Sequence, residues 1–211
     1  MVSTEKQLEI LHDHYKESFS HIREREKQRD LFFIILIFLF ALLIIEVQYP
    51  INFGGAIGKL SIPFGDIELN KLPLAALLSI SWVLTFTIAL RYCQATVAVD
   101  RQYVYLHTLE EKISKMFSEK DLYRREGKAY LQDYPLYREW VWYVYVIFFP
   151  IVLLIGTVLI TIAELNGLHT SVWYKTFDTI IAIGILVSVW IYRTPLQIFS
   201  RIKSKFKGNK V

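Results

Sequence analysis

Residues 31–45 read LFFIILIFLFALLII, an apolar run that contains no charged side chain. Three later runs have a similar composition, and with their flanking residues the four predicted crossings are 31–49, 72–92, 140–163 and 177–193. At a rise of about 1.5 Å per residue, helices of these lengths span the roughly 30 Å hydrocarbon core of a bilayer. The sequence therefore predicts an all-α integral membrane protein with four transmembrane helices and long cytoplasmic helical extensions.

The overall composition agrees with this fold class. Hydrophobic residues make up 54% of the 211 residues and aromatic residues 15%, which is too much for a small soluble domain with an ordinary surface. The charged residues, 21% of the chain, are concentrated between the apolar runs, and the formal net charge is +4. The single cysteine, Cys93, excludes an internal disulfide and a cysteine-based metal centre.

Lysine and arginine lie almost wholly on one side of the apolar runs. Of the 24 such residues, all except Lys59, Lys71 and Lys175 lie before the first run, between the second and third, or after the fourth. Short loops rich in these residues stay in the cytoplasm. We therefore expect both termini and the middle segment inside the cell. The predicted inner segments are 1–30, 93–139 and the basic tail 194–211, and the predicted outer loops are 50–71 and 164–176.

The inner segments have helical periodicity. In segment 1–30, apolar residues recur every third or fourth position from Leu8 to Ile22, and no helix breaker precedes the first crossing. We expect an amphipathic helix that runs unbroken into the bilayer, or one that lies along the membrane surface. No proline or glycine occurs from Arg91 to Glu126, so segment 93–139 should begin as a long helical stalk and end in a short aromatic helix. Apolar residues recur at helical spacing along the stalk from Val99 to Phe117, and we expect this stripe to be a packing face. The expected partners of the stalk are the N-terminal helix and the stalks of neighbouring subunits.

Pro150 and Gly156 interrupt the third crossing. Proline lacks the backbone N–H that a helix needs, so Pro150 should kink the helix. Gly156 should permit either hinging or close contact with another helix. We predict a gating kink at these two positions.

Several carboxylates mark the outer ends of the crossings and the first outer loop. In an oligomer they would form an electronegative vestibule that concentrates cations. The alternative is that they are ordinary interfacial acids, with Asp178 stabilised near a helix N-terminus by the helix dipole. The predicted vestibule residues are Glu46, Asp66, Glu68, Glu164 and Asp178.

Small and hydroxyl-bearing residues occur in the last three crossings. They could line a pore, but the same residue types also mediate helix packing in lipid. The candidates for either role are Ser79, Ser81, Thr85, Thr87, Thr157, Thr161, Gly184 and Ser188.

Basic and aromatic side chains are mixed in the middle segment. Such a mixture could hold an anionic nucleotide or a short single strand, although bases that set topology or bind lipid look the same. The candidate ligand-binding residues are Arg124, Arg125, Lys128, Tyr123 and Tyr130. We find no catalytic motif and no metal-ligand pattern, so we expect a non-enzyme without cofactor or metal.

Four short stretches carry a resemblance to a known family: HYKESF at 14–19, KQRDLF at 27–32, REGKAYL at 125–131 and YP at 134–135. They resemble a family of small bacterial four-span proteins found in anti-phage defence loci beside nucleotidyltransferase genes, most of all the membrane effectors of the Hailong system. The membrane subunits of the Kiwa system are similar to a smaller degree, because less soluble sequence is expected before their first span. The Hailong resemblance implies a tetrameric inner-membrane channel that stays closed until a nucleic-acid-like signal from a partner enzyme reaches its cytoplasmic helices. The open channel would then depolarise the cell.

Three functional hypotheses follow. The first is an oligomeric ion channel gated by a nucleotide, an oligonucleotide or a partner protein. The second is a membrane anchor or sensor that scaffolds a soluble defence partner. The third, a transporter of lipids or small molecules, is disfavoured because no charge lies in the middle of a crossing.

Overall fold

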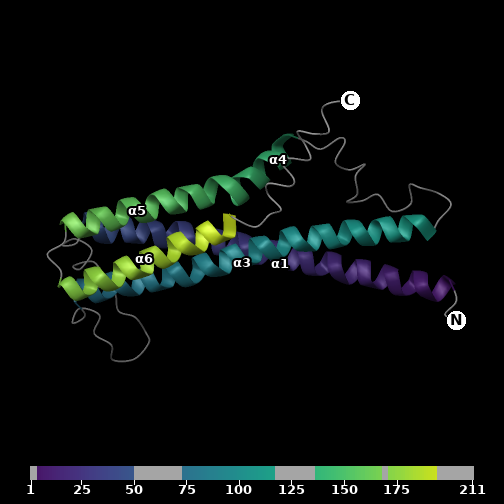
Figure 1. The fold of residues 1–211 in the computed structure, drawn as a ribbon, viewed down its shortest axis with the longest axis horizontal. Helices are drawn as coiled ribbons and strands as arrows, with labels where there is room; N and C mark the ends of the chain where they lie inside the picture. The colour runs from purple at the N-terminus through teal and green to yellow at the C-terminus, as the bar shows by residue number, and fades with distance from the viewer. Residues whose placement is uncertain (1–3, 50–72, 117–135, 168–170, 194–211) are drawn as a thin grey trace. The chain divides into compact units, whose positions relative to one another are not determined.

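The computed structural model describes residues 4–49, 73–116, 136–167 and 171–193, and the secondary structure of these residues is helical, without strands (Figure 1). The two longest helices are α1, Thr4–Gln48, and α3, Leu74–Met116. They are followed by α4, Leu136–Tyr143, the π-helical turn η2, Val144–Phe148, α5, Phe149–Gly167, and α6, Val172–Arg193. The predicted helical fold class is confirmed for this part of the chain. Four helical segments in it are long and apolar enough to cross a membrane.

Local sequence explains where the helices begin and end. Helix α1 contains no proline or glycine and ends shortly before Pro50, where the preceding residue disfavours helical geometry. Helix α3 begins after Pro73, whose carbonyl accepts hydrogen bonds from the backbone N–H groups of Ala76 and Leu77. Helix α5 ends at Gly167, a residue type favoured at helix C-termini.

Helices α1 and α3 both extend far beyond the length of a membrane crossing. Helix α1 has 45 residues and joins the predicted amphipathic segment to the first apolar run without a break. Helix α3 has 43 residues and continues the second apolar run into the predicted stalk as far as Met116. Of the two alternatives for segment 1–30, the structure has the unbroken helix, and the second apolar run continues as a helix to Met116.

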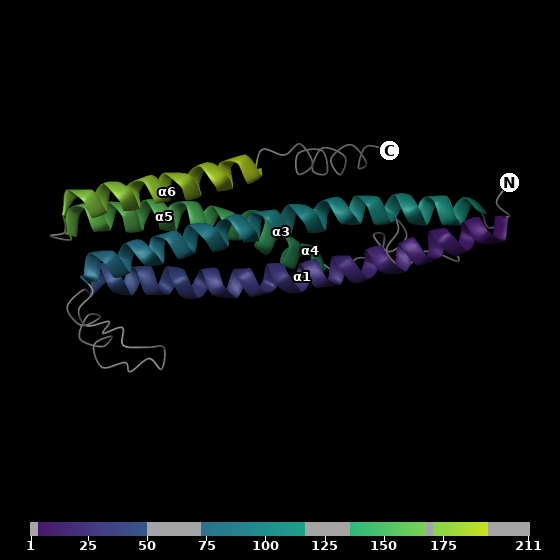
Figure 2. The ribbon, with the colours of Figure 1, turned by 90° about the horizontal axis from the view of Figure 1, so that it is seen from below.

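The chain divides into two compact units. The stalk unit comprises residues 1–33 and 94–150, and the apolar unit comprises residues 34–93 and 151–211. Both views show the N-terminal half of α1, in purple, running alongside the C-terminal half of α3, in teal (Figures 1 and 2). The stalk unit is thus built around an α1–α3 helix pair.

Apolar contacts hold the helix pair of the stalk unit together. Ile22 of α1 is 1% exposed, and the buried residues of α3 recur at helical spacing. They are Val99, Leu106, Leu109 and Ile113. These four belong to the stripe that the sequence predicts as a packing face, so that prediction is confirmed for α3.

The apolar unit carries large apolar side chains on its outer surface, where a soluble helix bundle carries polar ones. Its interior is filled by large side chains such as Trp82, Leu43 and Ile185, all fully buried. Its outer surface also carries large apolar residues, including Phe38 and Trp190, at 66% and 69% exposure. Such a surface suits contact with lipid chains, which are as apolar as the side chains they meet. The structure is therefore compatible with a multi-pass membrane protein.

Candidate functional site

Three carboxylic acids from three different helices come together inside the apolar unit. Glu46 lies near the end of α1, Glu164 near the end of α5, and Asp178 in the second turn of α6. Their exposed fractions are 2%, 2% and 1%. Asp178 interacts electrostatically with both glutamates, and it is close enough to Glu164 for one shared hydrogen to join the two carboxyl groups. We call these three residues the carboxylate cluster.

Helix α3 supplies the hydrogen-bond donors of the cluster from consecutive positions. The Ser81 hydroxyl donates to Glu46 Oε1 at 3.0 Å, and the Trp82 Nε1–H donates to Glu164 Oε2 at 2.9 Å. Trp82 itself is fully buried, so its ring fixes the direction of this donor. Each glutamate is therefore positioned by one neutral donor from α3.

The remaining polar atoms of the site lack hydrogen-bond partners. Glu46 Oε2, Glu164 Oε1 and both carboxylate oxygens of Asp178 are buried without one, and so is the Ser79 Oγ. Ser79 is 8% exposed and lies beside Asp178. A buried polar atom left without a partner costs roughly 1–3 kcal/mol. The site thus contains several buried acceptors and few donors.

Basic side chains do not neutralise the cluster within the described helices. The ion pairs found there involve other residues. Lys175 of α6 contributes an electrostatic interaction to Glu164, but its Nζ donates to the Leu165 carbonyl at 2.9 Å. Buried carboxylates without a paired cation are expensive in free energy, and inside a membrane they usually mark a functional site.

The arrangement differs from the vestibule that the sequence suggests. That prediction places the acids on an open surface between subunits, whereas Glu46, Glu164 and Asp178 are buried between helices of a single chain. Asp66 and Glu68 lie outside the described residues. The sequence places the three acids at one end of the crossings, but it does not indicate their convergence or the parts played by Ser79, Ser81 and Trp82.

Most of the predicted pore or packing residues bond to their own helix. Ser79, Ser81, Thr85 and Thr157 are buried. The following hydroxyls donate to the carbonyl four residues earlier: Thr85, Thr87, Thr157, Thr161 and Ser188. Gly184 packs against the Phe86 ring, since an added Cβ would lie 3.2 Å from it. Among these eight candidates, Thr87 is the one whose side chain is exposed.

The two residues of the predicted gating kink have separate structural effects. Regular α-helical bonding gives way to a π-helical turn at Val144–Phe148, just before Pro150. Proline both lacks an N–H and clashes with the carbonyl four residues earlier, which explains the local change. At Gly156, an added Cβ would come within 2.7 Å of Phe40, so this glycine provides close helix contact. Whether either residue takes part in gating stays a prediction.

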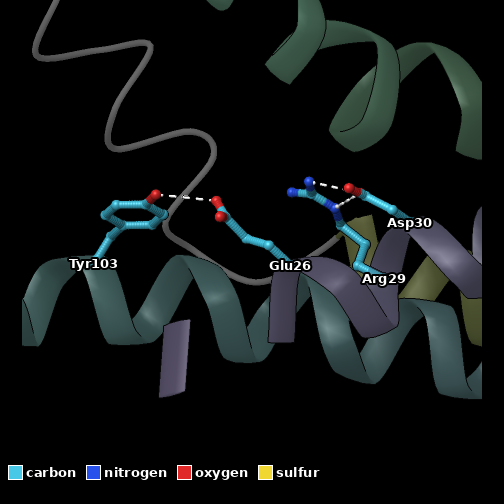
Figure 3. A network of polar contacts seen from close by, with 4 residues as sticks. All are labelled: Glu26, Arg29, Asp30 and Tyr103. Atoms are coloured by element: carbon cyan, nitrogen blue, oxygen red, sulfur yellow. Dashed lines mark hydrogen bonds and ion pairs between the residues drawn. The ribbon is translucent and has the colours of Figure 1, made fainter. Parts of the chain in front are cut away.

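The stalk unit contains polar contacts between α1 and α3 that the sequence analysis did not anticipate. The Tyr103 hydroxyl of α3 donates to Glu26 Oε1 of α1 at 3.0 Å, as Figure 3 shows. Farther along the pair, the Tyr15 hydroxyl of α1 donates to Glu110 Oε1 of α3 at 3.1 Å. Tyrosines at these positions fit the apolar stripe, so periodicity alone hides their polar role.

Arg29 links α1 to the π-helical turn within the stalk unit. Its guanidinium bonds to the adjacent Asp30 at 2.9 Å (Figure 3) and lies over the Tyr145 ring, with 4.4 Å between the guanidinium carbon and the ring centroid. Phe33 makes edge contacts with Tyr145 and Phe149. The predicted ligand-binding residues Tyr123, Arg124, Arg125, Lys128 and Tyr130 lie outside the described residues.

Fold and site together define a class: a helical protein with four segments able to cross a membrane and a buried carboxylate cluster between them. No protein-family model, curated protein or solved structure matches the chain.

Proposed function

We propose that this protein is a bacterial inner-membrane effector of anti-phage defence, acting as an oligomeric ion channel that opens at a cytoplasmic signal and depolarises the cell. The observation that supports it is the continuity of α1 and α3. Helix α1 carries both Glu26 of the stalk unit and Glu46 of the cluster, and α3 carries both Tyr103 and Trp82. A change in stalk pairing therefore acts on helices that also form the carboxylate cluster.

The proposed orientation follows from charge. Lysine and arginine flank one set of helix ends, so both termini and the stalk face the cytoplasm in this proposal. Four crossings are too few to enclose an aqueous pore, so the channel requires a homo-oligomer, of which a tetramer is the simplest. The proposed signal is a nucleotide, a single-stranded oligonucleotide or a soluble partner such as a nucleotidyltransferase.

Planar-bilayer recordings of the purified full-length protein test this proposal. We expect single-channel current steps whose frequency changes when single-stranded DNA or RNA oligonucleotides of defined length are added on the stalk side. Tyr103→Phe, which removes the hydroxyl that bonds Glu26, should change the fraction of time spent open. Tyr105→Phe is the matched control, because Tyr105 is an exposed tyrosine on the same helix. Electrical silence with every oligonucleotide, and with a candidate nucleotidyltransferase, would count against a channel.

One observation favours a membrane anchor as the second candidate. The outer surface of the apolar unit is dominated by large apolar side chains, and most of the predicted pore hydroxyls are buried or half-buried and bond to their own helix. An anchor needs only such a lipid-facing surface. Replacing the four apolar segments with an unrelated four-span anchor separates the candidates: full protection from phage would favour the anchor, and loss of protection the channel.

A further inference from the structure

We propose that the carboxylate cluster, together with Ser79, is a hydrogen-ion binding site inside the apolar unit. The site consists of Glu46 from α1, Ser79 from α3, Glu164 from α5 and Asp178 from α6. The proposal concerns what this site binds, and it holds whether the protein is a channel or an anchor.

The first argument is charge. Three ionised carboxylates that are at least 98% buried would repel one another where little solvent screens them. Taking one ion out of water costs several kcal/mol even after relaxation. Among the groups packed around the cluster in the described helices, α3 contributes the neutral Ser79, Ser81 and Trp82, and α6 contributes Lys175, which bonds to a backbone carbonyl. The described helices therefore supply too little positive charge to neutralise three ionised carboxylates.

The second argument is the imbalance between donors and acceptors. The partnerless atoms are four carboxylate oxygens and the Ser79 Oγ. An ionised carboxylate only accepts hydrogen bonds, so two adjacent ionised groups cannot bond to each other. A hydrogen ion on one carboxyl group turns that group into a donor, and Asp178 and Glu164 are close enough to share it. Among the partnerless atoms only the Ser79 hydroxyl can donate, and it can serve one of the four oxygens, so a hydrogen ion both lowers the charge and adds a donor.

The third argument concerns which cation fits. Metal ions need several ligands converging on one point. In the helices that the structure describes, no group of three His, Cys, Asp or Glu side chains converges in this way. A hydrogen ion needs only a pair of oxygens, which Asp178 and Glu164 provide. The geometry therefore favours hydrogen ions over a divalent metal held by three carboxylates, and the experiment below tests sodium directly.

Infrared spectroscopy of the full-length protein in phosphatidylcholine–phosphatidylglycerol vesicles tests the site without any measurement of current. Protonated carboxyl groups have a C=O stretching band separate from those of carboxylates. We expect wild-type protein at neutral pH to show this band, to shift it in D₂O, and to lose it on alkaline titration. Asp178→Asn and Glu164→Gln should each lose part of the band. Glu110→Gln should keep it, because Glu110 is a buried carboxylate of the stalk unit that bonds Tyr15.

Two results would overturn the proposal. One is a wild-type spectrum at neutral pH without a protonated-carboxyl band, a measurement that needs no variant to fold. The other is a sodium site, detected with a protein in which Trp82 is the sole tryptophan and reports on Glu164 through its hydrogen bond. If sodium at fixed pH changes the Trp82 emission in a saturable way, while Asp178→Asn abolishes that change, the bound cation is the metal. If channel recordings are silent but the band behaves as expected, only the proposed function fails.

Discussion

The two units use the same pair of long helices but treat buried carboxylates differently. In the stalk unit, the 3% exposed Glu110 receives the Tyr15 hydroxyl and lies 3.8 Å from the imidazole of His107. In the apolar unit, Asp178 has two buried oxygens without partners and Glu46 and Glu164 have one each. Each glutamate of the cluster accepts one hydrogen bond from another helix, as Glu110 does, so the difference lies in Asp178 and in the gathering of three acids.

We expect substitutions in the two units to have different effects on stability and on function. A carboxylate with donors on the opposite helix fixes the register of a helix pair, since its hydrogen bonds are satisfied in one alignment. A buried cluster with more acceptors than donors destabilises its bundle unless its charge is neutralised. Substitutions in the stalk unit should therefore change helix pairing, whereas substitutions around the cluster should also change how the protein responds to pH.

Replacing Trp82 by alanine should have the largest effect on stability. The substitution empties a fully buried site and removes the Nε1 donor of Glu164, and a buried Trp→Ala change typically costs about 3–5 kcal/mol. Denaturant unfolding in detergent micelles, followed by circular dichroism, measures the loss. Trp173→Ala is the control, because Trp173 is 84% exposed, and it should change stability little. Equal losses in the two variants would show that Trp82 does not support the cluster.

Gly156→Ala should have the next largest effect. The added Cβ would lie 2.7 Å from Phe40, so the ring or the helices must move, at a cost of about 1–3 kcal/mol for overpacking. Gly167→Ala is the matched control on the same helix, because no atom lies within 4 Å of its added Cβ. The same unfolding titration compares them. A stable Gly156→Ala protein would mean that α1 and α5 separate easily and would favour the hinge.

The sequence predicts the elements of this fold because their causes are local. A long apolar run such as 31–45 implies a buried or lipid-embedded helix, and the lack of proline and glycine between Arg91 and Met116 implies that α3 continues. The stripe on α3 also follows from periodicity alone. These features do not depend on which helix packs against which.

The cluster depends on that packing, and the sequence therefore gives only part of it. Charge patterning places Glu46, Glu164 and Asp178 at the same ends of their crossings. Whether they face lipid, a pore or one another depends on how each helix is rotated about its axis, which short helix ends do not specify. The sequence does not mark Trp82 as a hydrogen-bond donor to Glu164, because a tryptophan in an apolar run usually indicates a core or interface position.

Removing the hydroxyl of Tyr15 tests the helix pairing of the stalk unit on a smaller scale. Tyr15→Phe deletes the donor to Glu110 Oε1, and the net loss of such a bond is about 0.5–1.5 kcal/mol. Tyr105→Phe should be neutral, because Tyr105 is 51% exposed. Amide hydrogen exchange locates the effect, with faster exchange expected in the N-terminal half of α1 and not in α5 or α6. Uniformly faster exchange would contradict a contact specific to the stalk unit.

Thr87→Val should have the smallest effect on stability and is the sharpest test of pore lining. Thr87 is exposed on α3, and its hydroxyl bonds to the Val83 carbonyl, so losing it should change stability by no more than about 0.5 kcal/mol. If subunits of the proposed channel meet along this face of α3, Thr87 supplies a wettable group, and the valine variant should have a lower single-channel conductance. Thr108→Val is the matched control, because Thr108 is an exposed threonine with the same bond to the carbonyl four residues earlier, but in the stalk unit. An unchanged Thr87→Val conductance would move the conduction path away from this face of α3.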